Sequence, residues 1–154
     1  MIILRNFTSD DAEEFQQKQR KNISLDEIKA MFTNWGEKTY LGKYFEMFAV
    51  VKDGEIVGSI SLYQHSESVV SCAPEIFECY RKQGIAQEAM TIAMTIAKSK
   101  GYKLVSQQIR VNNIASIAFP KKPEINIFIS NLLFITEAIP PNTESNAAII
   151  AIAK

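Results

Sequence analysis

The chain has 154 residues, 47% of them hydrophobic, and its 17 basic side chains balance its 17 acidic ones. This length suits one domain with a full hydrophobic core. Because the formal net charge is zero, no overall field favours nucleic acid or an anionic membrane surface, and we expect neither as a partner.

The first residues, Ile2 to Phe7, read as a strand rather than as a basic region followed by a long apolar run. Such a start argues against a secretory signal, and no apolar run is long enough to span a bilayer. Cys72 and Cys79 lack the spacing of a metal site, so we expect two buried free thiols in a reducing compartment. These features predict a cytoplasmic protein without a metal.

Two helices are predicted before residue 37. The side-chain oxygens of Thr8, Ser9 and Asp10 can cap the start of the first helix, which reaches about Lys18. Ser24 and Glu27 have capping-box spacing and begin the second, whose apolar residues recur at a helical period. Phe32 and Trp35 lie on that apolar face, where core packing is favoured over a role in binding.

Three antiparallel strands and one parallel strand should follow. Asp53-Gly54 is a typical turn between the two halves of a hairpin from Phe45 to Gln64. Val69 to Cys79 is the third strand, and Pro74 within it suits an edge or a bulge. Leu104 to Val111 is reached through a helical crossover, so it should run parallel to the third strand.

The stretch from Tyr80 to Gly101 reads as a short loop and a helix, and it organises the chain. Gly84 and Ala86 carry little or no side chain, so a pyrophosphate could approach the backbone where the helix begins. The first amides of a helix have no intrahelical partner and the helix dipole is positive there. Arg81 and Lys82 add cationic donors. Alone the pattern is weak, because it arises by chance in roughly one chain of this length in seven.

Two motifs in the correct order resemble the GNAT superfamily of N-acetyltransferases, which use acetyl-CoA. Arg81, Gly84 and Ala86 match its pyrophosphate loop, Arg/Gln-x-x-Gly-x-Gly/Ala, and Asn113 and Ser116 match its Asn-x-x-Ser beside the pantetheine arm. The resemblance covers about residues 1–119. It implies a mixed α/β (α+β) fold, with a mainly antiparallel sheet flanked by helices and a splayed parallel strand pair that forms the cofactor cleft.

The resemblance also implies which residues bind acetyl-CoA. They are the end of the third strand, the loop and first helical turn, and two residues after the next strand: Ile76, Phe77, Arg81, Lys82, Gln83, Gly84, Ile85, Ala86, Asn113 and Ser116. In the family, a bulge in the third strand frees backbone groups for the cofactor, and the two N-terminal helices line the acceptor side.

Two residues are candidate bases for the acceptor amine. Glu75 lies on the strand that should flank the cleft, and His65, the single histidine, has a suitable pKa range. A lone histidine at a strand end is more often a surface residue, and Glu75 is more often solvated or hydrogen-bonded. The glutamate that serves as base in some family members falls on Ser71 here, so that carboxylate is missing.

The C-terminal part departs from the family. Pro120 stands where a Tyr is expected, and Glu124-Ile125 stand where Gly-Phe is expected. Residues 125–154 predict two apolar strands, Ile125 to Ile135 and Ala147 to Ala153. We treat residues 1–154 as a single domain with an atypical tail, whose apolar surface could support a homodimer.

The leading prediction is an N-acetyltransferase that transfers the acetyl group of acetyl-CoA to a primary amine of a small molecule or of a peptide or protein N-terminus. The missing Tyr motivates the alternative, a weak or inactive GNAT-like domain that binds acyl-CoA or a protein partner. A structural α/β domain with a coincidental loop is the third option. Deprotonating an α-amine at pH 7 costs about 1 kcal/mol, against about 4–5 for lysine, so the absence of a carboxylate at Ser71 favours a weakly basic amine.

Overall fold

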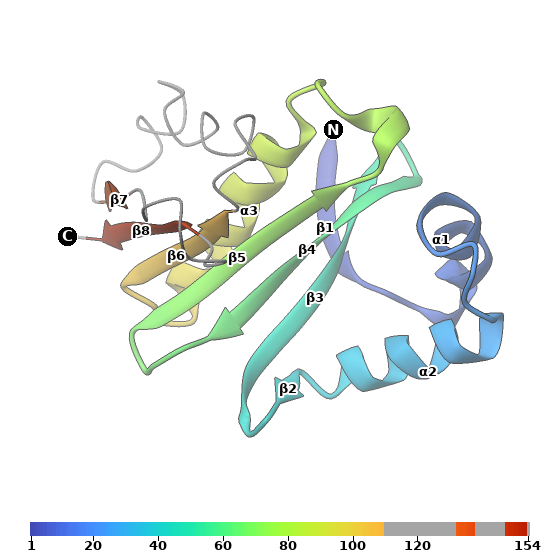
Figure 1. Ribbon diagram of the computed structural model, residues 1–154, viewed down its shortest axis with the longest axis horizontal. Helices are drawn as coiled ribbons and strands as arrows, with labels where there is room; N and C mark the ends of the chain where they lie inside the picture. The colour runs from blue at the N-terminus through green and yellow to red at the C-terminus, as the bar shows by residue number, and fades with distance from the viewer. Residues whose placement is uncertain (110–131, 138–146, 154) are drawn as a thin grey trace.

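The computed structural model describes residues 1–109, 132–137 and 147–153 (Figure 1). The N-terminal half contains β1 (Ile2–Asn6), the 3-10 turn η1 (Ser9–Asp11), α1 (Ala12–Gln19), α2 (Leu25–Gly36), β2 (Thr39–Tyr40), β3 (Lys43–Lys52) and β4 (Glu55–Gln64). After these come β5 (Val69–Ile76), the 3-10 turn η2 (Glu78–Tyr80), α3 (Ile85–Ser99), β6 (Leu104–Ile109), β7 (Leu132–Glu137) and β8 (Ala147–Ala153). Among the described helices, none is long and apolar enough to cross a membrane.

The strands form one sheet in the order β1-β3-β4-β5-β6-β8-β7, with β2 paired to β3 beside β1. In the described part of the chain, β5 and β6 are the one parallel pair. The crossover between them is α3, because parallel neighbours need a long connection. The expected mixed, mainly antiparallel sheet is confirmed.

β5 and β6 part soon after they meet. They pair only from Val69, opposite Leu104, to Ser71, opposite Ser106. From there β5 continues to Ile76 along β4 alone, while the rest of β6 pairs with β8. The expected splayed parallel pair is therefore present, and it opens toward the end of β5 from which the chain enters α3.

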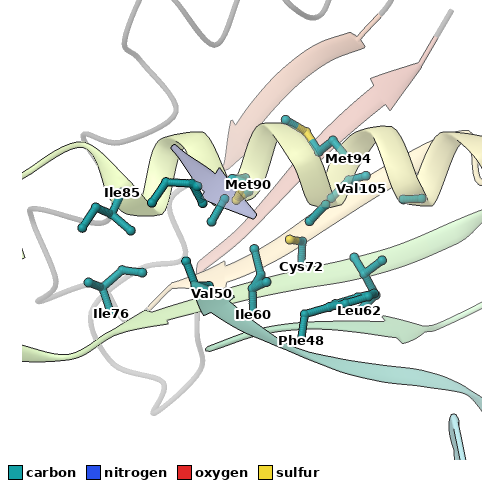
Figure 2. Packing of buried hydrophobic residues seen from close by; sticks show 14 of the residues in the cluster. Phe48, Val50, Ile60, Leu62, Cys72, Ile76, Ile85, Met90, Met94 and Val105 are labelled. Carbon is teal, nitrogen blue, oxygen red and sulfur yellow. The ribbon is translucent and has the colours of Figure 1, made fainter. Parts of the chain in front are cut away.

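Helices cover both faces of the sheet, α3 on one and α1 with α2 on the other (Figure 1). The buried side chains of α3 recur at one-turn spacing, which gives an apolar stripe toward the sheet: Ile85, Ala89, Met90, Ala93, Met94 and Ala97. Figure 2 shows Ile85, Met90 and Met94 facing Ile76, Val50 and Cys72 of the strands. This packing fixes the start of α3 above the end of β5.

An aromatic cluster holds α1 and α2 against the other face. The ring of Phe7 stacks on Phe32 with centroids 4.7 Å apart, and Trp35 lies 5.4 Å from Phe32. Phe15 meets Phe32 edge-on at 5.4 Å and Phe77 at 6.1 Å. Phe32 is thus a buried core residue and Trp35 packs against it partly buried, so both take part in the core packing favoured from the sequence. Such ring pairs contribute about 0.5–1.5 kcal/mol each beyond the area that they bury.

The predicted turn and cap are confirmed. Asp53 and Gly54 both have positive φ, 52° and 92°, as a type I′ hairpin requires. At the start of α2, the amide of Glu27 donates to Ser24 Oγ at 3.3 Å, and the Glu27 carboxylate accepts from the Ser24 amide at 3.0 Å.

Pro74 lies on a local edge of the sheet and not in a bulge. It stands opposite Ile60 in a β4–β5 ladder that keeps its register from Gly58 to Gln64. By alternation Pro74 faces the side that β6 has left, so its missing N–H costs no ladder bond. The irregularity lies elsewhere, between Val50 and Val51 where β3 pairs with β4.

Other boundaries differ from the prediction. β5 ends at Ile76, and the residues up to Tyr80 form η2 instead of continuing the strand to Cys79. This turn leaves Cys79 exposed, which corrects the expected buried thiol, whereas Cys72 is buried beneath α3. Residues 110–111 and 125–131, predicted as parts of strands, lie outside the described residues.

Candidate active site

The site is built where β5 passes into α3. After η2, the loop from Arg81 to Gly84 brings the chain to the first residue of α3, Ile85. Lys82 and Gly84 both lie in the left-handed region, with φ of 63° and 77°. This conformation is easy for glycine but costs a residue such as lysine of the order of 1–3 kcal/mol, and such strain gathers at functional sites.

In the described part of the chain, the loop presents a row of backbone amides without an acceptor. The amides of Gln87 and Glu88 donate to the Gly84 carbonyl at 3.0 and 3.2 Å, which marks the start of the helix. Within the residues that the structure describes, the amides of residues 82–86 have no acceptor. Consecutive free amides at a helix N-terminus bind anions, phosphate above all.

Cationic side chains flank these amides. Arg81 Nε donates to the carbonyl of Ile76 at 3.0 Å, which holds the guanidinium beside the end of β5. Its terminal amino groups have no partner among the described residues. Lys82 is exposed, and Lys52 reaches the loop through Gln83 Oε1 at 3.1 Å. Arg81, Lys82, Gln83, Gly84, Ile85 and Ala86 therefore come together in one turn, a candidate anion site that we name the anion-binding turn.

Ile76 and Phe77 differ in what they can offer a ligand. The Phe77 amide donates to the Val57 carbonyl at 3.0 Å, and the Phe77 carbonyl accepts from Tyr80 at 2.9 Å. By alternation along β5, Ile76 directs its backbone groups to the opposite side, toward the opening between β5 and β6. β4 thus already uses the Phe77 amide, and the contact of Phe77 with the cofactor stays a prediction. Its ring is buried in the α1–α2 core.

Asn113 and Ser116, expected beside the pantetheine arm, lie outside the described residues. Pro120, at the position of the family Tyr, does so too. The structure leaves these three as sequence predictions.

Glu75 lies on the α1–α2 side of the sheet, opposite Ser59 in the β4–β5 ladder. Its carboxylate is exposed, and Oε1 accepts a hydrogen bond from Gln19 Nε2 at the end of α1. The second carboxylate oxygen has no partner among the described residues. A carboxylate held at one oxygen and open at the other can accept a proton directly or through a water.

His65 is a surface residue just beyond β4. Its amide donates to the Val69 carbonyl at 2.9 Å, and its ring meets Tyr63 edge-on at 5.2 Å. The register places His65 beside position 69 of β5, about 20 Å along the strand from position 75. The structure therefore does not bring His65 and Glu75 together, and the two are alternatives rather than partners.

A buried carboxylate that the sequence did not single out belongs to the scaffold. Glu46 is 3% exposed and accepts hydrogen bonds from Lys38 at 2.7 Å, Tyr44 at 2.5 Å and Asn6 at 3.1 Å. Lys100, at the end of α3, lies 3.5 Å away. Burial works against its charge, but the bonds from Lys38, Tyr44 and Asn6 outweigh burial and lower its pKa to about 2. Glu46 ties the end of α3 to β3, far along the helix from the anion-binding turn.

Sequence reasoning also missed Lys18 and Gln19, which reach Tyr80 and Glu75 from the end of α1. Nothing in the local sequence marks them, because their partners lie more than 50 residues away.

The family model described as acetyltransferase (GNAT) domain matches residues 1–123, close to the extent of the resemblance. No curated protein matches the chain. A crystal structure of a probable acetyltransferase aligns with a TM-score of 0.76 and 18% identity, over 99% of this chain and 93% of that one.

Two further solved structures share this fold. RimL, a ribosomal L7/L12 alpha-N-protein acetyltransferase in complex with coenzyme A, aligns with a TM-score of 0.70, 16% identity and coverages of 97% and 92%. A spermidine N-acetyltransferase SpeG chimera from Vibrio cholerae and hSSAT aligns with a TM-score of 0.71, 12% identity and coverages of 99% and 95%. The chain belongs to the GNAT acetyltransferase family, whose members use acetyl-CoA as cosubstrate.

Proposed function

We propose that this protein is an N-acetyltransferase that transfers the acetyl group of acetyl-CoA to a primary amine. The observation that carries the proposal is the row of amides at residues 82–86, which have no partner among the described residues and lie at the end of β5 where it has parted from β6. A diphosphate bound there would be held by backbone donors and by Lys82 and Arg81.

The same placement gives the pantetheine arm a path. Between Ser71 and the end of β5, the strand has no β6 partner over residues 72–76, a length of about 16 Å. By alternation the Ile76 amide faces this gap and could donate to a carbonyl of the extended arm, whereas the Ile76 carbonyl already accepts from Arg81 Nε. Asn113 and Ser116 remain our proposed contacts on the other side of the arm.

The chemistry is an acyl transfer between bound substrates. The amine nitrogen attacks the thioester carbonyl carbon, the carbon–sulfur bond breaks, and sulfur leaves as a thiolate while the nitrogen loses a proton. A thiol that titrates near the cysteine reference of about 8.5 leaves with modest help, so the missing Tyr at Pro120 is tolerable. Glu75 is our proposed acceptor of the amine proton through a water, with His65 as the alternative.

The proposed class of acceptor depends on how easily the acceptor amine loses its proton at pH 7. With Ser71 where some family members carry a glutamate base, an α-amine or another weakly basic amine is preferred, because its neutral form is far more populated at pH 7 than that of lysine. Among the fold neighbours are an alpha-N-protein acetyltransferase and a spermidine acetyltransferase. We favour the first type of acceptor, a peptide, protein or small-molecule α-amine.

Calorimetric titration with acetyl-CoA, followed by a broad amine panel, tests the proposal. We expect saturable binding and turnover of α-amines. No binding at millimolar acetyl-CoA by the folded protein would overturn the proposal. Binding without turnover of any amine would favour the alternative, a GNAT-like domain that binds acyl-CoA or a protein partner.

We also propose a single cytoplasmic domain that pairs through its apolar C-terminal part. In the described sheet β7 is the outer strand, and an unpaired strand edge is a surface on which a second copy can add. Sedimentation at high protein concentration should reveal a dimer, and a strict monomer would refute this pairing.

A further inference from the structure

We infer that the last turn of α1 positions both halves of the proposed site, Lys18 through Tyr80 and Gln19 through Glu75. Lys18 and Gln19 are consecutive residues, and each contacts a side chain of the β5–η2 segment more than 50 residues further along the chain. The inference rests on the proposed function and extends it to two residues that touch neither substrate.

Lys18 is the centre of a polar cluster. Its ammonium donates to Glu14 Oε1 at 2.7 Å, to the Ile56 carbonyl at 3.1 Å and to the Tyr80 hydroxyl at 3.1 Å. It also lies 5.1 Å from the centre of the Tyr80 ring, and that hydroxyl donates to Glu55 at 2.8 Å. The three donor contacts use the full capacity of an ammonium group.

The polar cluster is partly desolvated. The side chain of Lys18 is 24% exposed and that of Glu14 is 34% exposed, and Glu14 Oε1 also accepts from the Ile56 amide at 3.0 Å. Burial works against the charge of Lys18, but the hydrogen bonds to Glu14 and Tyr80 outweigh it and raise the pKa. Removing the ammonium would take one donor from each of these partly buried acceptors, which costs more than the loss of a fully exposed ion pair.

Tyr80, held by its hydrogen bond from Lys18, positions the start of the anion-binding turn. It immediately precedes Arg81, and its ring packs against both cores of the protein. Because Lys82 adopts a left-handed conformation that is unfavourable for lysine, the turn depends on what holds its ends. The polar cluster around Lys18 holds the N-terminal end of this turn, and the packing of Ile85 holds its C-terminal end.

Gln19 acts on the other half of the site. Its amide nitrogen donates to Glu75 Oε1, and the second carboxylate oxygen has no partner among the described residues. Because Lys18 and Gln19 share one helical turn, α1 sets the position of the anion-binding turn and of the proposed base together. Both are positioning residues, since neither is placed against the reacting atoms.

The test separates binding of the cofactor from turnover. The variants are Lys18→Met, Lys18→Arg, Tyr80→Phe and Gln19→Leu, with Lys21→Met as control because Lys21 is exposed and has no partner among the described residues. Coenzyme A affinity is measured by calorimetry, and kcat and KM with an amine found in the panel.

We expect Lys18→Met to weaken coenzyme A binding at least fivefold and Tyr80→Phe to weaken it in the same direction. Lys18→Arg should restore binding to within twofold of the wild type. Gln19→Leu should lower kcat at least threefold with coenzyme A affinity unchanged, and Lys21→Met should change neither quantity.

Wild-type affinity in a folded Lys18→Met protein, or in Tyr80→Phe if the first variant does not fold, would overturn the inference while the proposed function stands. So would an unchanged kcat in Gln19→Leu. Absence of coenzyme A binding by the wild type would overturn both, which distinguishes the two failures.

Discussion

Gly58 of β4 lies directly against the backbone of Glu75 on β5. A Cβ at Gly58 would press on the carbonyl oxygen of Glu75 and lie 3.0 Å from the Cα of Ile76. The two strands can approach this closely only because position 58 has no side chain. The end of β5, with its proposed base and its route into the anion-binding turn, is therefore positioned by a glycine on the neighbouring strand.

Gly58→Ala should destabilise the protein by about 1–3 kcal/mol, as overpacking of a filled site usually does. It should also weaken acetyl-CoA binding, because β5 must shift to accept the methyl group. Urea unfolding and calorimetry measure the two effects. Gly36→Ala is the matched control: a Cβ there meets nothing within 4 Å at the end of α2, so stability should hold or rise. Equal stability of the two variants would contradict the close approach.

Gly84→Glu should abolish acetyl-CoA binding, because it places a negative charge and added bulk beside the diphosphate. Gly84 has a φ of 77° but open space around its Cβ position, so Gly84→Ala carries a similar backbone strain without the charge. We expect the alanine variant to bind with modestly reduced affinity. Affinity of Gly84→Glu within threefold of the wild type would mean that the phosphates bind elsewhere.

Glu75→Gln should lower kcat/KM at least tenfold at neutral pH while coenzyme A affinity is unchanged, since the amide cannot accept the amine proton. The pH–rate profile should lose the limb that reports this base. His65→Ala is the comparison and should act much less, because His65 lies near the opposite end of β5. An unchanged rate and profile in Glu75→Gln would leave amine deprotonation to solvent.

Glu46 should make stability depend on acid pH. Its pKa is lowered from 4.5 to about 2 in the folded protein, so its contribution is full above pH 4.5 and is lost as the pH falls toward 2. The shift corresponds to about 3 kcal/mol at most. Glu46→Gln should thus be less stable than the wild type at pH 7, with the gap closing between pH 5 and 2.

Thermal unfolding across this pH range measures that gap. Glu67→Gln serves as control, because Glu67 is exposed and has no ion pair among the described residues. A constant difference between Glu46→Gln and the wild type from pH 7 to pH 2 would contradict the lowered pKa.

Local sequence determined those features whose causes are local. The Asp53-Gly54 turn and the Ser24–Glu27 capping box were predicted at their observed positions, because each depends on a few adjacent residues. The loop before α3 was predicted for the same reason, since a glycine able to take positive φ and a helix start are adjacent in the chain. The motif that matched it covers the same six residues that the structure gathers into one turn.

Tertiary structure decided everything that depends on partners far along the chain. The sequence around Pro74 was compatible with an edge or with a bulge. Pro74 lies on an edge because β6 stops pairing with β5 after Ser71. The amide of Phe77 is used by Val57 of β4, and η2 exposes Cys79. Lys18 and Gln19 have no local signature at all, because hydrogen bonds between α1 and the β5–η2 segment form only after the sheet has brought them together.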